Sequence, residues 1–248
     1  MAIHFKPNLR GVIAVFCLVS FMAACSKNKT ARKETYTYTI TTPVFAARAD
    51  MLAAINGNVS EPVKTAGKLY IKGEFIYLNE VEKGIHIIDN SNPSNPKQIT
   101  FLNIPGNMDM AVRGDILYAD TYTDLLAIDI SNPRKAKVVK DIRNFFYRYS
   151  YLGADSDMII AGITKKDTTV ETGGWPGCAN CEFDMLSLSS AAGGTPKSNS
   201  GTAGSMASMV LMNEYLYALQ EAHSIGIVDV SNPAAPRLDT SFNAGFDL

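Results

Sequence analysis

Two cysteines separated by two residues are the first candidates for chemistry in this sequence: Cys178 and Cys181. In an oxidising compartment such a pair most simply forms a disulfide. A redox pair would need a helix N-terminus to lower the thiol pKa, and the glycine-rich surroundings predict none. A structural zinc site would need four ligands, and no second cysteine pair follows. We therefore expect a Cys178–Cys181 disulfide, with a redox pair and a metal site as the alternatives.

Other residue types that catalyse reactions are few and scattered. His86 falls within an apolar strand, which favours a packed histidine, and His223 stands alone. The acidic pair Asp120 and Asp124 falls at a strand end, where solvation explains it. The sequence has no serine nucleophile motif, phosphate loop or histidine-based zinc signature. We expect no enzyme, no catalytic residue, no metal ligand and no cofactor, although sites assembled from separate segments escape such a search.

The only tryptophan lies next to the cysteine pair, in a segment rich in glycine. Trp175 and Pro176 precede the cysteines, and Asn180 lies between them. Long loops on a rigid scaffold often carry binding function. We interpret Trp175, Pro176 and Asn180 as a candidate partner-binding loop, with a tolerated surface insertion as the alternative.

Composition excludes one class of partner. The 248 residues carry 23 basic and 24 acidic side chains, a formal net charge of −1. Nucleic-acid binding usually requires a basic excess, so no nucleic-acid partner is expected. The 46% of hydrophobic residues is ample for a core.

One sequence motif, an apolar strand ending in Asp and followed by Ser-Asn-Pro, occurs three times. It occupies Gly84–Pro93, Leu125–Pro133 and Ile225–Pro233, and the first two Asp residues are 40 residues apart. A self-similar period of about 40 residues indicates a solenoid or a propeller.

Strand patterns decide between these two architectures. The first unit reads as four short strands, Lys68–Lys72, Phe75–Val81, Ile85–Asn90 and Lys97–Ile104. The third strand is apolar at nearly every position, as expected for a strand buried on both faces between neighbouring sheets. The sequence therefore predicts an all-β fold, a β-propeller of four-stranded blades.

The repeated Asp and Pro residues are predicted to be structural. Asp at a strand end can accept backbone N–H groups of the turn, and Pro cannot donate to a sheet ladder. These repeat positions are Asp89, Pro93, Asp129, Pro133, Asp229 and Pro233.

At Ile87–Asp89, Ala127–Asp129 and Ile227–Asp229, each with its trailing Ser-Asn-Pro, the sequence resembles the LVIVD repeat. That repeat occurs in bacterial and archaeal cell-surface proteins and is predicted to form β-propellers. The resemblance covers roughly residues 67–143 and 204–243. It implies a surface propeller of unassigned molecular function and supplies no catalytic residue.

Residues 1–24 have the pattern of a lipoprotein signal peptide. Lys6 and Arg10 precede an apolar run, Gly11–Ala24, that is too short for a comfortable transmembrane helix. Met22–Cys25 resembles a lipobox, where bacterial lipoproteins are cut before a cysteine that receives acyl chains such as palmitate. The resemblance implies a membrane tether through acyl chains on Cys25. The alternatives are an ordinary signal peptide and an uncleaved anchor.

The residue after Cys25 is Ser26 rather than the Asp that holds lipoproteins in the inner membrane. By that analogy we expect the outer membrane, on its periplasmic or its surface face. Residues 25–42 are interpreted as lipidated Cys and polar tether, and residues 43–66 as a short cap with helical character at Phe45–Ile55. Residues 67–248 form the propeller repeats, with an insertion at about 164–203. The alternation in Thr35–Ile40 also allows an edge strand.

The spacing predicts about four blades. Asp129 and Asp229 are 100 residues apart, room for a hidden blade whose first two strands would be Phe145–Leu152 and Met158–Ile163. Propellers have roughly four to eight blades. We expect an incomplete ring from a fragment or a truncated reading frame, with a closed ring of four blades as the alternative.

Three kinds of function fit these patterns. The first is a lipid-anchored binding or scaffold module for a protein or glycan partner. The second is a propeller enzyme or sensor with a site in the central channel, lined by first strands such as Met108–Val112 and Met206–Leu211. The third is a structural spacer of the envelope. We favour the first.

Overall fold

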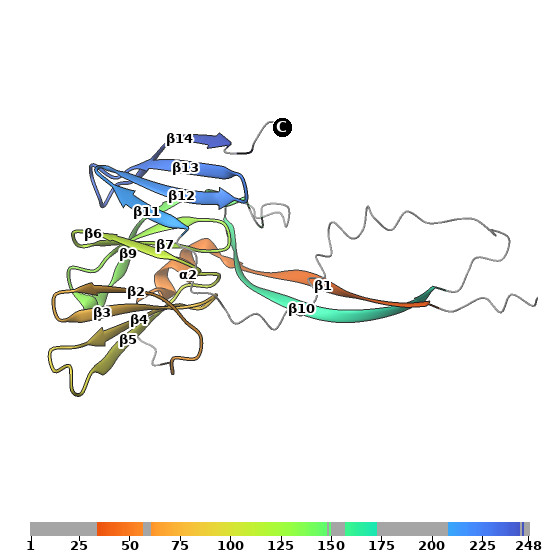
Figure 1. Cartoon of the computed structure of the whole chain (residues 1–248), viewed down its shortest axis with the longest axis horizontal. Helices are drawn as coiled ribbons and strands as arrows, with labels where there is room; N and C mark the ends of the chain where they lie inside the picture. The colour runs from red at the N-terminus through yellow and green to blue at the C-terminus, as the bar shows by residue number, and fades with distance from the viewer. Residues whose placement is uncertain are drawn as a thin grey trace, which may run out of the picture. The chain divides into compact units, whose positions relative to one another are not determined.

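Three antiparallel four-stranded sheets dominate the computed structural model, which describes residues 34–56, 61–147, 149, 157–172, 208–243 and 245. In each sheet the strands pair in chain order, and the sheets stand side by side (Figure 1). We call them blade 1 (β2–β5), blade 2 (β6–β9) and blade 3 (β11–β14). The predicted β-propeller fold is confirmed.

The strands match the predicted segments closely. Blade 1 contains β2 Ala66–Lys72, β3 Phe75–Glu80, β4 Gly84–Asp89 and β5 Lys97–Asn103. Blade 2 contains β6 Met110–Arg113, β7 Ile116–Asp120, β8 Leu125–Asp129 and β9 Lys137–Ile142. Blade 3 contains β11 Met209–Met212, β12 Tyr215–Glu221, β13 Ser224–Asp229 and β14 Arg237–Asn243.

The first hairpin of each blade turns at an equivalent residue with a left-handed backbone. Gly73 and Gly114 have φ of 56° and 57°, and Asn213 has φ of 54°. Two-residue hairpins require positive φ, which Gly adopts freely and Asn tolerates. The register of the repeats is therefore set by the same turn chemistry in all three blades.

Each blade also has the same irregularity between its third and fourth strands. The register shifts between Ile87 and Ile88, between Ala127 and Ile128, and between Ile227 and Val228. A bulge bends the strand and increases its local twist. The three blades thus share one shape as well as one sequence pattern.

The core lies between the blades. One buried cluster joins blades 1 and 2 and includes Ile87 and Leu126. A second cluster joins blades 2 and 3 and includes Leu125 and Leu216. The middle blade is therefore buried on both faces, which explains why its third strand is apolar from Leu125 to Ile128.

Strands β1 (Glu34–Ala47) and β10 (Met158–Thr172) form a two-stranded sheet, and α2 (Arg48–Ala54) follows β1. The chain divides into two compact units, Met1–Ile40 with Asp167–Gly194, and Thr41–Lys166 with Thr195–Leu248. In the first unit, described at 34–40 and 167–172, Thr39 donates a hydrogen bond to Asp167. The second unit contains the three blades and α2.

Two predictions about connecting segments are corrected. The predicted fourth blade is wrong for the described residues, because Phe145–Tyr147 are not strand and Met158–Ile163 belong to β10, which pairs with β1. The predicted tether is strand from Glu34 onward. An alternating pattern identifies a strand without identifying its partner, and β1 offers β10 a partner of nearly equal length. Within the described part of the chain, no helix has the length and apolar character needed to cross a bilayer.

Candidate functional site

The three Asp-x-Ser-Asn-Pro turns have the predicted turn-capping geometry. The N–H groups of Ser91, Ser131 and Ser231 donate to the Asp two residues earlier, over 3.0, 2.9 and 2.9 Å. Hydrogen bonds from the Ser hydroxyl and the Ser N–H hold the pKa of all three Asp residues below its usual range, the hydroxyl being the larger cause at Asp89, and with Arg237 they hold that of Asp229 at about 2. The repeated Pro residues lie outside the strands. The turns are therefore structural, since their polar groups bind the chain itself.

Asp109 joins all three blades at the start of their inner strands. Its carboxylate is buried and accepts the N–H groups of Ser208 at 2.6 Å and Met209 at 2.8 Å in blade 3. The Nζ atom of Lys68 in blade 1 lies 3.0 Å from the other carboxylate oxygen. Lys68, Asp109 and Ser208 occupy the same repeat position, one residue before Leu69, Met110 and Met209 in register.

This junction bears on the channel hypothesis. Polar residues from three blades do converge, as a channel site would require. They bind one another, however, through an ion pair and charge-assisted hydrogen bonds. We therefore interpret the junction as a link that fixes the blades.

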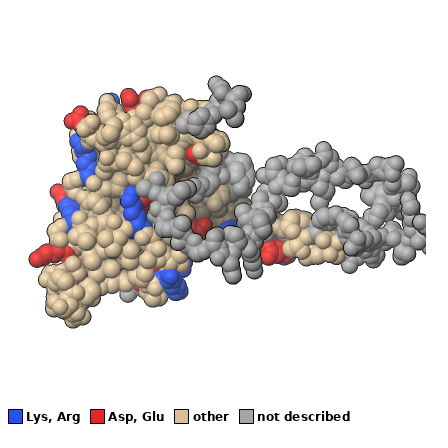
Figure 2. Space-filling view, viewed as in Figure 1, with Lys and Arg blue, Asp and Glu red and all other residues tan. Residues whose placement is uncertain are grey.

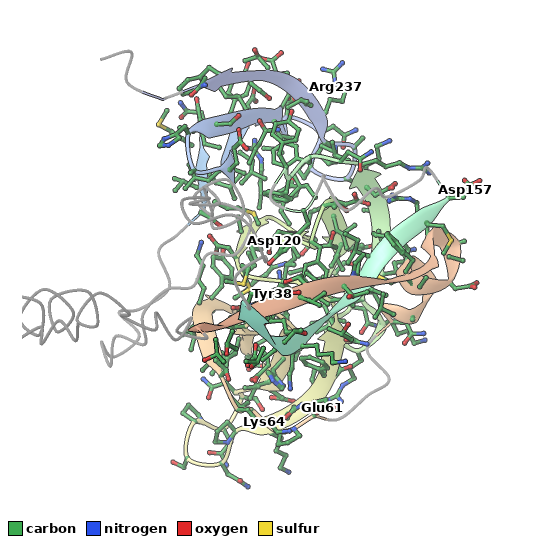
Figure 3. The ribbon with its side chains drawn as sticks, turned by 90° about the vertical axis from the view of Figure 1, so that its right-hand side faces the viewer. Tyr38, Glu61, Lys64, Asp120, Asp157 and Arg237 are labelled. Atoms are coloured by element: carbon green, nitrogen blue, oxygen red, sulfur yellow. The ribbon has the colours of Figure 1, made fainter. Side chains whose placement is uncertain are left out.

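Asp120, at the end of β7, is buried among the blades and contacts Asp109 (Figure 3). One of its carboxylate oxygens accepts three hydrogen bonds, from the Asn107 amide at 2.8 Å, Met108 N–H at 2.8 Å and Asp109 N–H at 2.9 Å. Burial raises the pKa of this carboxyl, the Asp109 and Met108 N–H groups lower it, and the nearby Asp109 carboxylate raises it, so that it lies at about 7 instead of 3.8. The interpretation of Asp120 and Asp124 as solvated acids is wrong, because both are buried.

A small hollow that opens to solvent lies beside Asp120, with an accessible volume of about 20 Å³. We call it the turn hollow, because the turns after β3 and β7 contribute to it, together with the end of β12. Its lining residues are Glu82, Gly106, Met108, Asp120, Thr121, Tyr122, Phe146, Tyr149, Ser208, Leu219 and Gln220. None of these is Lys, Arg or His, so the charge of the lining is acidic.

Aromatic rings and a constrained acid shape the turn hollow. The rings of Tyr122 and Tyr149 meet edge to face with centroids 5.2 Å apart. Burial raises the pKa of Tyr122, and the Glu82 carboxylate raises it further. Glu82 itself has φ of 64°, and its backbone is held by hydrogen bonds to Asn107 and Gly106. A non-glycine residue in this conformation is uncommon and often marks a functional position.

His86 is packed, as the sequence predicts. It is fully buried, its Nε2 atom lies 3.3 Å from a Glu80 carboxylate oxygen, and its ring centroid lies 4.6 Å from that of Phe101. Burial raises the pKa of Glu80, but hydrogen bonds from Lys64 N–H, Thr65 N–H and His86 hold it below its usual range. This pair binds the chain leading into blade 1.

Arg48 attaches the short helix α2 to blade 2. Its buried guanidinium pairs with Asp124 and lies 3.4 Å from an Asp141 carboxylate oxygen. Asp124 also accepts the Asn144 N–H at 3.0 Å. Burial of a charge requires such partners, so Asp124 has a structural role.

The residues predicted to do chemistry or bind a partner fall elsewhere. Cys25, Trp175, Pro176, Cys178, Asn180 and Cys181 lie outside the described residues. The sequence reasoning missed the turn hollow and the Asp109 junction. The repeat register held the missing signal, because aligning the blades brings Lys68, Asp109 and Ser208 to one position.

The fold and the repeated turns define a class, a repeat protein built of β-propeller blades. The model of the LVIVD repeat matches residues 64–100, 106–139 and 203–244, and these ranges fall on blades 1, 2 and 3. The chain thus carries three LVIVD repeats. No curated protein matches the sequence.

Two solved structures show a distant likeness. One is a complex from S. cerevisiae of Dbp5 bound to Nup159, Gle1, IP6 and ADP, at 10% identity and a TM-score of 0.37. The other is the N-terminal domain of Nup159, at 10% identity and a TM-score of 0.34. Each match covers 72% of this chain, which spans only 30% and 31% of those chains. The assignment of the fold therefore depends on the blades and the repeats themselves.

Proposed function

We propose that this protein is a lipid-anchored binding module of the bacterial outer membrane, and that the open mouth of its turn hollow binds a basic side chain of a protein partner. The observation that carries the proposal is the lining of the hollow. Carboxylates, tyrosines and an amide come together there from three blades, with no basic residue among them.

The chemistry of the lining favours a cation. A guanidinium or ammonium group is attracted to the face of a tyrosine ring, by about 0.5–1 kcal/mol at an exposed site. A carboxylate such as Glu82 adds a charge-assisted hydrogen bond. The left-handed backbone of Glu82 is fixed by the loop before β6, so the acid is positioned before a partner arrives.

A direct test uses small cationic probes. Methyl resonances of protein labelled at methionine would be followed by NMR during titration with N-acetyl-lysine amide and N-acetyl-arginine amide, because Met108 lines the hollow. We expect saturable shifts of the Met108 methyl group. Glu82→Gln should weaken binding on the order of 10-fold, as the charge-assisted bond is lost.

Glu74→Gln is the matched control, because Glu74 lies in the turn between β2 and β3 and is not part of the hollow. It should leave the titration unchanged. Diacetylchitobiose serves as a glycan probe. Shifts with this sugar but not with the cations would show that the hollow binds a glycan instead of a basic side chain.

The anchor needs a separate measurement. Intact mass of the protein purified from membranes should correspond to a chain that begins at an acylated Cys25. A rise of about two mass units on reduction would show the Cys178–Cys181 disulfide. An unmodified chain beginning near residue 25 would make the protein a free secreted one and remove the anchor from the proposal.

The loop with Trp175, Pro176 and Asn180 is the second element of the proposed binding module. Deleting residues 173–183 should weaken partner capture and leave the thermal unfolding of the blades unchanged. A large drop in the unfolding temperature would instead give this loop a structural role.

A further inference from the structure

Equivalent positions of the three blades differ sharply in exposure. Val112 in the middle blade is 8% exposed, whereas the equivalent Ile71 of blade 1 is 58% exposed. On the opposite side of the sheet, Ala111 is 8% exposed and the equivalent Val210 of blade 3 is 54% exposed. The residue types stay apolar although, among the described residues, only the middle blade has another blade packed on each side.

These positions define two open faces. The entry face is the side of blade 1 directed away from blade 2, and the exit face is the side of blade 3 directed away from blade 2. The entry face contains Leu69, Ile71, Ile76, Leu78 and Ile88. The exit face contains Val210, Tyr215, Tyr217, Leu219, Ile225, Ile227 and Phe242.

We propose that the exit face of one copy of this chain packs on the entry face of a second copy, and that two such contacts close a ring of six blades. The argument is continuity with an interface that the chain already makes twice. Blade 1 packs on blade 2, and blade 2 on blade 3, in the same way. In each contact the side equivalent to the exit face packs on the side of the next blade that is equivalent to the entry face. The open faces are the two halves of that same interface, exposed at opposite ends.

Specific contacts of the internal interface have counterparts on the open faces. The Tyr118 hydroxyl of blade 2 donates to the Pro233 carbonyl of blade 3 over 2.9 Å. The equivalent Tyr217 of blade 3 and Pro93 of blade 1 are in place to repeat this bond between copies. Methionine is enriched at interfaces, and the exposed Met212 stands where blades 1 and 2 carry Lys72 and Arg113.

Symmetry makes this assembly finite. An exit-to-entry contact is heterologous, and heterologous contacts close only when the rotation per copy completes a circle. Two copies of the three blades formed by the described residues give six, which lies within the usual range of propellers. The entry face and the exit face of each copy are then both buried in the ring.

The test is native mass spectrometry of the full-length protein in detergent. We expect twice the mass of one chain. Ile71→Glu and Val210→Glu should each weaken the dimer on the order of 100-fold or more, because each places an unpaired carboxylate in an apolar contact. Val139→Glu is the matched control, since Val139 is exposed on the outer strand of the middle blade and should leave the dimer intact.

Mixing the two variants sharpens the result. A pair made of one Ile71→Glu copy and one Val210→Glu copy keeps one intact contact, so heterodimer should form where neither variant pairs alone. Circular dichroism melting should show that both variants remain folded. A monomeric wild-type chain, an open-ended series of larger masses, or a dimer sensitive to only one of the two variants would overturn the proposal.

Discussion

At the residue scale, Asp109 of blade 2 links the first strands of blades 1 and 3 through Lys68, Ser208 and Met209. Replacing it by Ala removes the acceptor of the Ser208 and Met209 N–H groups and leaves the Lys68 ammonium with only the Met209 carbonyl. Removing one partner of a buried ion pair costs about 3–5 kcal/mol, so Asp109→Ala should lower the free energy of unfolding by that amount. Chemical denaturation measures it.

The exposed pair of Lys72 and Asp115 supplies the control for this prediction. Asp115→Ala should cost under about 1 kcal/mol, as surface ion pairs usually do. Equal effects of the two substitutions would show that the Asp109 junction contributes no more than a surface contact.

Asp120 gives the protein a pH dependence of the opposite sign to that of most acids. Its pKa is near 3.8 in the unfolded chain and about 7 in the folded one, so between these values the folded state holds the extra proton. Stability should fall as pH rises through this window, with a slope on the order of 1.4 kcal/mol per pH unit. Asp120→Asn keeps an acceptor oxygen and should flatten this slope in denaturation curves from pH 4.5 to 8. A slope unchanged in the variant would assign it to another group.

At the scale of elements, two glycines are required for different reasons. At Gly84 two strands approach each other closely, whereas Gly114 lies in a turn. Gly84 begins β4 with φ of 148°, and a Cβ atom there would lie 1.9 Å from the Leu102 carbonyl oxygen. Gly84→Ala should therefore force β5 away and lower the free energy of unfolding by more than about 3 kcal/mol. Gly114 has φ of 57° and open space around it, so Gly114→Ala should cost only about 1–2 kcal/mol. Thermal unfolding that ranks the two variants in the reverse order would contradict this account.

The sequence patterns correctly predicted those strands and turns that are formed by interactions between residues close in the chain. The Asp129 turn could be predicted because its hydrogen bond reaches only to Ser131. The environment of Asp120 could not, because its donors lie 11 to 13 residues away in the preceding loop. The pairing of β10 with β1 joins segments more than 100 residues apart, and alternation along a strand carries no information about its partner.

For the molecule as a whole, the middle blade determines how the blades unfold. Leu126 packs in the cluster toward blade 1, and Leu125 packs in the cluster toward blade 3, from adjacent positions of one strand. Because both clusters depend on β8, loss of either one removes support from the other. We expect Leu126→Ala and Leu125→Ala each to cost about 2–5 kcal/mol and to lower a single unfolding transition in calorimetry.

Repeat proteins also unfold in steps when the blade interfaces are weak, because each repeat contacts only its neighbours. Two resolved transitions, with each Leu variant shifting only one of them, would show that blades 1 and 3 unfold independently. Val63→Ala, at an exposed position before blade 1, is the control. Its free energy of unfolding should stay within about 0.5 kcal/mol of that of the wild type. A single transition shifted by both core variants would mean that the three blades fold as one body, because the middle blade shares its two faces between them.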